Sequence, residues 1–258
     1  MNKFMKSATI ALAMVMGAGS AFAAGCPAKV RIGVEGAYPP FSEMTPEGQL
    51  KGFDIDIALA LCQTMRTECT LVPQDWDGII PALLARKYDA IIASMSITEE
   101  RKKKVSFTNK YYNSPAKFVS RKGAGVEISA SGLKGKKIGV QRATTHDNYL
   151  TDNYPDVEIV RYGTQDEVYL DLAAGRIDAA LQDSIAADDG FLKTDSGKDF
   201  EFIGPGLSDP RWFGEGAGIA IRKADDTLEK CFNDAITEIR ANGAYKTIND
   251  KYFEFDIF

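Results

Sequence analysis

The stretch LLARKYDAIIAS at residues 83–94 decides the fold, because a similar stretch, DLAAGRIDAALQ, returns at residues 171–182. In both, the end of a helix leads through a basic residue and an Asp-Ala pair into an apolar strand. The Asp-Ala pair alone could arise at any turn from a helix to a strand. The order of elements around the two stretches also repeats, and this predicts two similar α/β lobes.

The first lobe opens with an alternation of strands and helices. Apolar periodicity and the turn residues between segments predict strands at 28–35, 69–74 and 88–94, and helices at 52–65 and 76–87. Asp54 and Asp56 mark the expected start of the first helix. A βαβαβ order of this kind indicates a parallel sheet with helices on its faces.

The same order starts again further along the chain. Strands are predicted at 136–140, 157–163 and 176–182, and helices at 144–154 and 165–175. A strand at 214–223 and one long amphipathic helix at 225–245, with Gly243 near its end, then return to the first lobe. We therefore expect lobe 1 to hold residues 24–112 and 210–258, and lobe 2 to hold 113–209. Two hinge segments are expected, near 112–115 and near 206–213.

The first 23 residues have the features of a secretory signal peptide. Lys3 and Lys6 precede an apolar run, and AFA at 21–23 is a small-x-small cleavage signal. The AAGC that ends at Cys26 weakly resembles a lipoprotein processing site, but Ala23 replaces the usual Leu, so lipid anchoring is disfavoured. The leader predicts export to the periplasm.

The charge of the chain limits its partners. The sequence has 31 Lys and Arg against 36 Asp and Glu, a net charge of −5. An acidic chain with no basic block argues against nucleic acid or anionic lipid as a partner. No later apolar run approaches the roughly 20 residues that a membrane span requires.

The cysteines predict disulfides, since their number is even and the chain carries an export signal. Cys62 and Cys69 are close in sequence, across the end of a helix and the start of a strand, which favours a local bridge. Cys26 and Cys231 remain as the second pair by elimination, a pairing that sequence does not prove. A zinc site is disfavoured, because there is no CxxC motif and a single histidine.

Polar residues at the predicted strand ends form the candidate ligand site, because ligands of open α/β sheets bind beyond the carboxyl ends of the strands. Glu35 and Tyr38 follow the first strand, ASMS at 93–96 ends the third, and Asp183 ends the last strand of lobe 2. The complete set is Glu35, Tyr38, Trp76, Ala93, Ser94, Ser96, Arg101, Thr144, Thr145, His146 and Asp183.

These residue types are complementary to an amino acid with a cationic side chain. Arg101 offers a planar fork to a carboxylate, and the helix start at Thr144 and Thr145 offers backbone N–H groups. Asp183 suits an α-ammonium group. Glu35 would neutralise a cation at the far end of the ligand, between the aromatic faces of Tyr38 and Trp76.

Each residue also has a plain structural interpretation. Ser96 and Glu99 fit a capping box that would simply start a helix. Arg101 could be a solvated charge, Tyr38 and Trp76 could be core aromatics, and His146 could lie at a helix end. Asp183 could cap the next helix. Their joint placement at strand ends is what favours the ligand site over these alternatives.

Known enzyme signatures are missing from the sequence. There is no G-x-S-x-G, no P-loop and no G-x-G-x-x-G, and a lone histidine disfavours most triads. We expect no catalytic residues, no cofactor and no metal.

The chain resembles the periplasmic binding proteins for polar amino acids, above all the lysine/arginine/ornithine-binding and histidine-binding proteins. The likeness runs through RIGVEGAYPPF, GFDIDIALALC, DGIIPAL, YDAIIASMSIT, LKGKKIGV and AGRIDAALQD, in that order, and covers essentially the whole mature chain. The resemblance implies a type II periplasmic binding protein fold, with two mostly parallel or mixed sheets that close on one amino acid about a two-segment hinge. It also implies delivery to an inner-membrane ABC permease by a monomeric carrier.

The resemblance implies the same ligand set, with Arg101 and the start of the lobe 2 helix on the α-carboxylate and Asp183 on the α-ammonium. It also implies the Cys62–Cys69 bridge. The sequence departs from the family at Glu35, Trp76, Ala93 and His146, where the relatives carry Asp, Phe or Leu, Ser, and Gln. Arginine is the expected ligand, ahead of lysine, ornithine and histidine.

Three alternatives stay open. Opine binders of the family share Glu35 and Trp76, so an octopine- or nopaline-like ligand fits, although Asp183 favours a free α-ammonium. A periplasmic enzyme similar to cyclohexadienyl dehydratase would need a general acid in the cleft, for which Glu35 is the candidate. A receptor input domain is disfavoured, because no signalling segment is attached.

Overall fold

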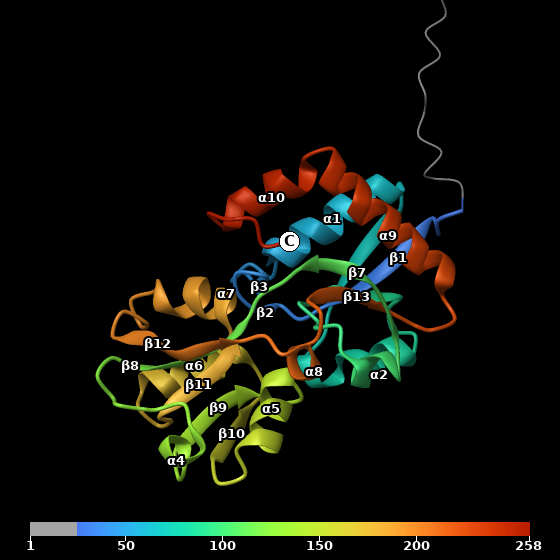
Figure 1. The fold of residues 1–258 in the computed structure, drawn as a ribbon. Helices are drawn as coiled ribbons and strands as arrows, with labels where there is room; N and C mark the ends of the chain where they lie inside the picture. The colour runs from blue at the N-terminus through green and yellow to red at the C-terminus, as the bar shows by residue number, and fades with distance from the viewer. Residues whose placement is uncertain (1–24) are drawn as a thin grey trace, which may run out of the picture.

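The computed structural model describes residues 25–258, which form two α/β lobes connected by extended strands (Figure 1). The expected signal peptide at residues 1–23 lies outside the described residues. The first lobe is built on a five-stranded sheet. Its strands, in spatial order, are β5 (Glu68–Pro73), β1 (Lys29–Val34), β6 (Ala90–Ile91), β13 (Ala217–Ile221) and β7 (Ser106–Tyr112).

The second lobe repeats this plan. Its five strands, in spatial order, are β10 (Glu158–Tyr162), β9 (Lys137–Gln141), β11 (Ala179–Asp183), β8 (Ala116–Arg121) and β12 (Phe200–Leu207). In both sheets the first three strands run parallel and the last two are antiparallel to their neighbours. The predicted α/β fold with two mixed sheets is confirmed. A small hairpin sheet beside the first lobe consists of β2 (Ala37–Tyr38), β3 (Ser42–Met44) and β4 (Leu50–Lys51).

Helices cover the faces of both sheets. In the first lobe they are α1 (Phe53–Met65), η2 (Trp76–Gly78), α2 (Ile79–Leu84), α3 (Glu99–Lys102), α9 (Asp226–Ala241) and α10 (Ala244–Tyr252). In the second lobe they are α4 (Ala130–Leu133), α5 (Thr145–Asn153), α6 (Gln165–Ala173), α7 (Ser184–Ala187) and η3 (Asp188–Leu192). Across residues 25–258, no helix combines the length and apolarity that a membrane span requires.

The chain passes twice between the sheets. Residues 113–115 connect β7 to β8, and residues 208–216, which include the short helix α8 (Pro210–Phe213), connect β12 to β13 (Figure 1). Both connections overlap the segments predicted as hinges. Phe213 packs in a core cluster of the second lobe, whereas Ala217 already belongs to a strand of the first. The division at residues 112/113 and 209/210, and the hinge role itself, stay predictions.

The first helix occupies Phe53–Met65, in agreement with the predicted 52–65. Asp54 and Asp56 lie within the first turn of α1, and Gly52 occupies the N-cap with a φ of 127°. A Cβ at Gly52 would lie 2.3 Å from the carbonyl oxygen of Phe41, so glycine is required there for both conformation and space. Asp54 is thereby drawn into the interior, where it is 1% exposed.

The predicted single helix at 225–245 is two helices in the structure. Gly243 adopts a φ of 84° and separates α9 from α10. The left-handed conformation ends one helix and redirects the chain into the next. The amphipathic face of α9 was predicted correctly, since Phe232 and Ile236 are buried in the core cluster that also holds Ile57 and Leu61 of α1.

The third predicted strand is shorter than the apolar run at 88–94. Only Ala90 and Ile91 form the ladder of β6. Ser94 then adopts a φ of 51°, an unusual conformation for a residue with a side chain. The chain therefore leaves the sheet within the ASMS segment, at the edge that faces the second lobe.

Two disulfides connect the cysteines in the expected pairs. Cys62 is bonded to Cys69 across the turn from α1 to β5. Cys26 is bonded to Cys231 of α9, over a sequence separation of 205 residues. The second bond ties the N-terminal segment to the C-terminal part of the same lobe, and it leaves no thiol at Cys26 for lipid attachment.

Direct contacts hold the two lobes together in this closed arrangement. The indole Nε1 of Trp76 in the first lobe donates to the carbonyl oxygen of Ala143 in the second, at 3.2 Å. Beside it, Arg142 Nε donates to Asp77 Oδ2 at 2.5 Å, in an ion pair whose side chains are 49% and 38% exposed. These contacts exist only while the lobes are together, so they favour the closed state.

Removal of the long-range disulfide should destabilise the protein more than removal of the local one. In the chain-entropy account, a loop of 205 residues is worth about 5 kcal/mol and one of 7 residues about 2 kcal/mol. Urea unfolding of Cys26→Ser/Cys231→Ser and of Cys62→Ser/Cys69→Ser measures the difference. Equal losses of unfolding free energy would show that loop length does not set the effect.

Arg142→Ala should shift the lobes toward the open state. An exposed ion pair contributes about 0.2–1 kcal/mol, so the closed-to-open ratio should fall by up to about fivefold. Single-molecule FRET between one dye on each lobe measures the populations. Arg176→Ala is the matched control, because its ion pair with Asp171 lies within the second lobe. A shift of the same size in both variants would argue against the cross-lobe role.

Candidate ligand-binding cleft

A small cavity of about 30 Å³ lies between the lobes. It is lined by Glu35, Tyr38, Trp76, Ala93, Ser94, Ser96, Arg101, Gln141, Thr144, Thr145, His146 and Gln165. The structure therefore brings together all the residues predicted to contact the ligand except Asp183. The space equals that of one or two water molecules, so the lobes or their side chains must move before an amino acid enters.

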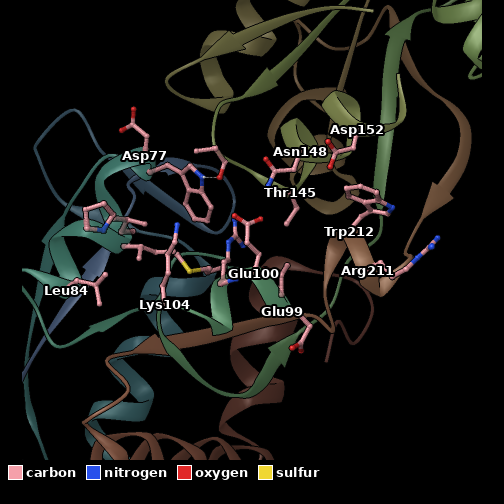
Figure 2. Close-up of a pocket in the computed structure, with 18 residues that line it drawn as sticks. Asp77, Leu84, Glu99, Glu100, Lys104, Thr145, Asn148, Asp152, Arg211 and Trp212 are labelled. Atoms are coloured by element: carbon pink, nitrogen blue, oxygen red, sulfur yellow. Dashed lines mark hydrogen bonds between the residues drawn. The ribbon is translucent and has the colours of Figure 1, made fainter. Parts of the chain in front are cut away.

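A wider groove of about 730 Å³ adjoins the cavity and shares Trp76, Arg101 and Thr145 with it. Figure 2 shows the groove between Leu84 and Lys104 on one side and Asn148, Asp152 and Trp212 on the other. It forms the outer mouth of the cleft. The cavity is the inner end, where the candidate ligand contacts meet.

Arg101 reaches the cavity from the short helix α3. The side chain is held by its Nη1, which donates to the carbonyl oxygen of Ser96 at 3.0 Å, and by the Trp76 ring, whose centroid is 5.1 Å from Cζ. Burial lowers its pKa to about 10, so the guanidinium remains cationic at neutral pH. The charge of Glu100 acts on it in the opposite direction, but among the described residues Arg101 forms no ion pair with a carboxylate, so this half-buried cation is available to an anionic group.

The predicted capping box at this helix is wrong. Thr98 is the N-cap of α3, and its Oγ1 accepts a hydrogen bond from Arg101 N at 3.3 Å. Ser96 lies two residues earlier and pairs with Ala217 in an isolated β-bridge. Ser96 is thus freed from capping, and its carbonyl oxygen positions Arg101.

The helix start at α5 is the second anion-binding element. Thr144 is its N-cap, with Oγ1 accepting from Asp147 N at 3.2 Å and donating to Gln141 O at 2.7 Å. The N–H groups of the first turn, at Thr145 and His146, have no acceptor within the helix. This helix end therefore adds donors and a partial positive charge opposite Arg101.

His146 is a neutral residue of the site. Burial, and then the charge of Arg101, lower its pKa to about 3. Its ring lies 5.8 Å from that of Phe213, so it is wedged between the helix start and α8. At neutral pH it offers one N–H donor and one acceptor rather than a positive charge.

Glu35 is the carboxylate that lines the cavity. Glu35 follows β1, and its Oε1 accepts a hydrogen bond from Gln141 Nε2 across the lobes. Burial raises the pKa of Glu35 to about 7, an effect that the Gln141 bond partly opposes and nearby acids such as Asp166 reinforce. Because burial destabilises the ionised carboxylate, a cation placed beside Glu35 would stabilise it strongly.

Asp183 is the cap of α7, as its structural interpretation predicted. Its Oδ1 accepts from Ile185 N at 2.9 Å, from Ala186 N at 3.2 Å and from Ser114 Oγ at 2.7 Å. Burial nevertheless raises its pKa to about 6. It does not line the cavity, so its predicted role toward an α-ammonium stays a prediction.

Asp54 is a buried acid that the sequence reasoning missed. Its Oδ2 accepts from Ser94 Oγ at 2.9 Å, and its Oδ1 accepts from the Tyr111 hydroxyl at 2.8 Å. Burial raises its pKa to about 7. Because the hydroxyl proton of Ser94 is committed to Asp54, Ser94 presents an acceptor to the cavity. The left-handed backbone at Ser94 makes this geometry possible.

Gln141 and Gln165 also line the cavity and were missed. Gln141 is the last residue of β9, and Gln165 is the first residue of α6. The strand-end rule that selected the other residues would have selected Gln141, since it closes the strand KIGVQ after the apolar residues IGV, and Gln165 follows shortly after the end of β10. They were overlooked because their uncharged amides showed no chemistry by themselves.

Comparison with known proteins identifies the family. Residues 30–255 match the profile described as bacterial extracellular solute-binding proteins, family 3. The chain is 56% identical over 231 residues to an L-arginine-binding protein of Pseudomonas aeruginosa, covering 89% of each chain. It is 43% identical to a histidine-binding periplasmic protein of Salmonella typhimurium, covering 98% of this chain and 99% of the other.

Among solved structures, it is similar to a Salmonella typhimurium periplasmic binding protein described as highly specific for arginine. The TM-score is 0.81 at 34% identity, and the match covers 88% of this chain and 100% of that one. The match to each of these proteins covers most of both chains. The chain belongs to the bacterial extracellular solute-binding proteins of family 3.

Proposed function

We propose that this protein captures a cationic L-amino acid in the periplasm, arginine first and then lysine, ornithine or histidine, and delivers it to an ABC permease of the inner membrane. The observation that carries the proposal is the half-buried Arg101, which forms no ion pair with a carboxylate among the described residues, in the same cavity as the half-buried acid Glu35. The cavity is therefore polarised, with donors at one end and an acceptor at the other.

This polarity matches the two ends of a basic amino acid. The α-carboxylate would lie between the Arg101 fork and the first turn of α5, where charge-assisted hydrogen bonds are strong. The cationic side chain would extend past Tyr38 and Trp76 to Glu35. Ser94 and Asp183 would accept from the α-ammonium group.

Binding would act by a population shift. The ligand contacts residues of both lobes, so it adds its binding free energy to the closed state only. The closed form then differs from the open form in the shape of its surface, which gives a permease the means to select loaded carriers. The relatives are named as binding proteins for arginine and histidine, which supports a carrier rather than an enzyme. We expect the carrier to be a monomer.

Calorimetry with arginine, lysine, ornithine, histidine, glutamate and octopine tests the proposal. Arginine should bind most tightly, and Arg101→Ala should lose 2–5 kcal/mol, roughly 30- to several-thousand-fold in affinity, because the carboxylate loses a desolvated partner. Arg211→Ala is the control, since Arg211 lines only the outer groove and is 82% exposed. Tight binding of glutamate without any basic amino acid would contradict the charge assignment, and a clear preference for octopine would make the ligand an opine.

The affinity for arginine should fall as the pH falls. Burial raises the pKa of Glu35 to about 7, and a bound cation favours the ionised carboxyl. Protons therefore compete with arginine below neutral pH, and affinity should drop about 10- to 30-fold between pH ~8 and pH ~5.5.

Glu35→Gln provides the comparison for this pH dependence. It should weaken arginine far more than the neutral analogue citrulline, and it should flatten the pH profile of arginine binding. Calorimetry over the same pH range measures both effects. Parallel pH profiles in the wild type and the variant would show that Glu35 does not face the side chain.

A further inference from the structure

Asp54, Ser94 and Tyr111 form a closed ring of hydrogen bonds in the first lobe. The Ser94 hydroxyl donates to Asp54 Oδ2 at 2.9 Å, and the Tyr111 hydroxyl donates to Asp54 Oδ1 at 2.8 Å. The backbone N–H of Ser94 donates to the Tyr111 hydroxyl oxygen at 3.1 Å and closes the ring. The three residues come from the start of α1, the segment after β6 and the strand β7, so tertiary packing brings them together.

Ser94 is the member of this ring that lines the cavity. Both of its hydrogen-bond donors are used inside the ring, since its N–H serves Tyr111 and its O–H serves Asp54. What a serine has besides these two donors is lone pairs, on Oγ and on the carbonyl oxygen. Ser94 therefore offers the cavity acceptors only. The same two hydrogen bonds hold its unusual left-handed backbone, with a φ of 51°.

Asp54 sets the direction of the hydrogen bonds in the ring. An ionised carboxylate only accepts, so both hydroxyl protons point toward it. Asp54 is 1% exposed and Tyr111 is 0% exposed, so bulk water does not compete for these protons. Asp183 lies near enough for its charge to act on Asp54, which places two carboxylates in the region of Ser94. An acceptor with negative charge around it suits a cationic donor.

We infer that Asp54 is a positioning residue of the ligand site, which acts through Ser94 and makes it an acceptor for the α-ammonium group of the bound amino acid. The inference rests on the proposed function and deepens it, because it gives a role to an acid that is not among the residues lining the cavity. The α-ammonium is common to all α-amino acids, so Asp54 supports affinity whatever the ligand side chain. Glu35, by contrast, would act on the side chain alone.

Asp54→Asn tests the inference. An amide has one acceptor oxygen and a nitrogen that only donates, so it can accept only one of the two hydroxyl protons. Tyr111 is fully buried and its oxygen already accepts from Ser94 N, whereas Ser94 borders the cavity. The amide nitrogen should therefore face Ser94 and turn its hydroxyl proton into the cavity, against the ammonium group. Calorimetry should show the Kd of arginine rising about 10- to 100-fold, the range for a lost hydrogen bond to a charged group.

Two comparisons show whether the effect passes through Ser94 to the α-ammonium. The first uses δ-guanidinovalerate, which is arginine without the α-amino group, and its Kd should change less than about threefold in Asp54→Asn. The second uses Ser94→Gly, which removes the hydroxyl while glycine keeps the left-handed backbone without strain. In that background, Asp54→Asn should raise the Kd of arginine less than about threefold further.

Asp56→Asn is the matched control. Asp56 also lies in the first turn of α1, and its Oδ2 accepts from the Tyr252 hydroxyl at 2.8 Å and from Lys251 Nζ at 2.6 Å. It is not among the residues that line the cavity. Its replacement should leave the Kd of arginine unchanged, although it removes the same kind of bond from the same helix turn.

Tyr111→Phe keeps the inference falsifiable if Asp54→Asn does not fold. It removes the acceptor of Ser94 N–H and leaves the bond from Ser94 Oγ to Asp54 in place. The Kd of arginine should then rise about 3- to 10-fold, because the backbone of Ser94 is held less firmly while the polarity of its hydroxyl is kept. An unchanged Kd in this variant would contradict the role of the ring.

The outcomes separate the inference from the proposed function. A folded Asp54→Asn protein with the wild-type Kd for arginine, or with an equal loss for δ-guanidinovalerate, would overturn the role of Asp54 while the basic amino acid assignment stands. A wild type that binds glutamate and no basic amino acid would overturn the proposed function alone, because glutamate carries the same α-ammonium group and Asp54→Asn should weaken it equally. A wild type that binds no amino acid would overturn both.

Discussion

The cleft depends on a half-buried cation, Arg101, that forms no ion pair with a carboxylate among the described residues. Arg101 is held by the Ser96 carbonyl oxygen and the Trp76 ring, and no acidic residue among the described ones pairs with it. Burial of an unpaired charge is costly, and a protein that needed only stability would place a carboxylate beside it. The cost is tolerated at a site where an anion is delivered from outside.

The acidic side chains of the cleft region, Glu35, Asp54 and Asp183, are likewise charges removed from water, but negative ones. Burial raises the pKa of Glu35 and Asp54 to about 7 and that of Asp183 to about 6. The cleft is thus an arrangement of separated charges that lack ion-pair partners among the described residues. Asp54 accepts hydrogen bonds from the hydroxyls of Ser94 and Tyr111. Asp183 accepts them from Ser114 and from the backbone at the start of α7. Glu35 has only Gln141, which makes it the acid most dependent on a ligand.

The sequence was sufficient for the architecture because the architecture is repeated and periodic. The strand-end rule located most of the cavity lining, since parallel strands place their carboxyl ends at one edge. Predictions of helix starts and ends failed where local backbone geometry decides the result. Thr98 rather than Ser96 caps α3, and Gly243 splits the last long helix. Asp54 lies in the first turn of α1 as predicted, but the periodicity does not show that its side chain is buried there.

The overlooked Gln141 shows how binding and closure are coupled. Gln141 bridges the lobes to Glu35, so part of the acidic end is already satisfied by the protein. Arg101 has no such carboxylate partner among the described residues. A bound amino acid would therefore contribute least where the lobes already meet and most at Arg101. A ligand that pairs with a group that the protein leaves without an ion pair adds free energy to the closed state, which is the condition for it to shift the lobes toward closure.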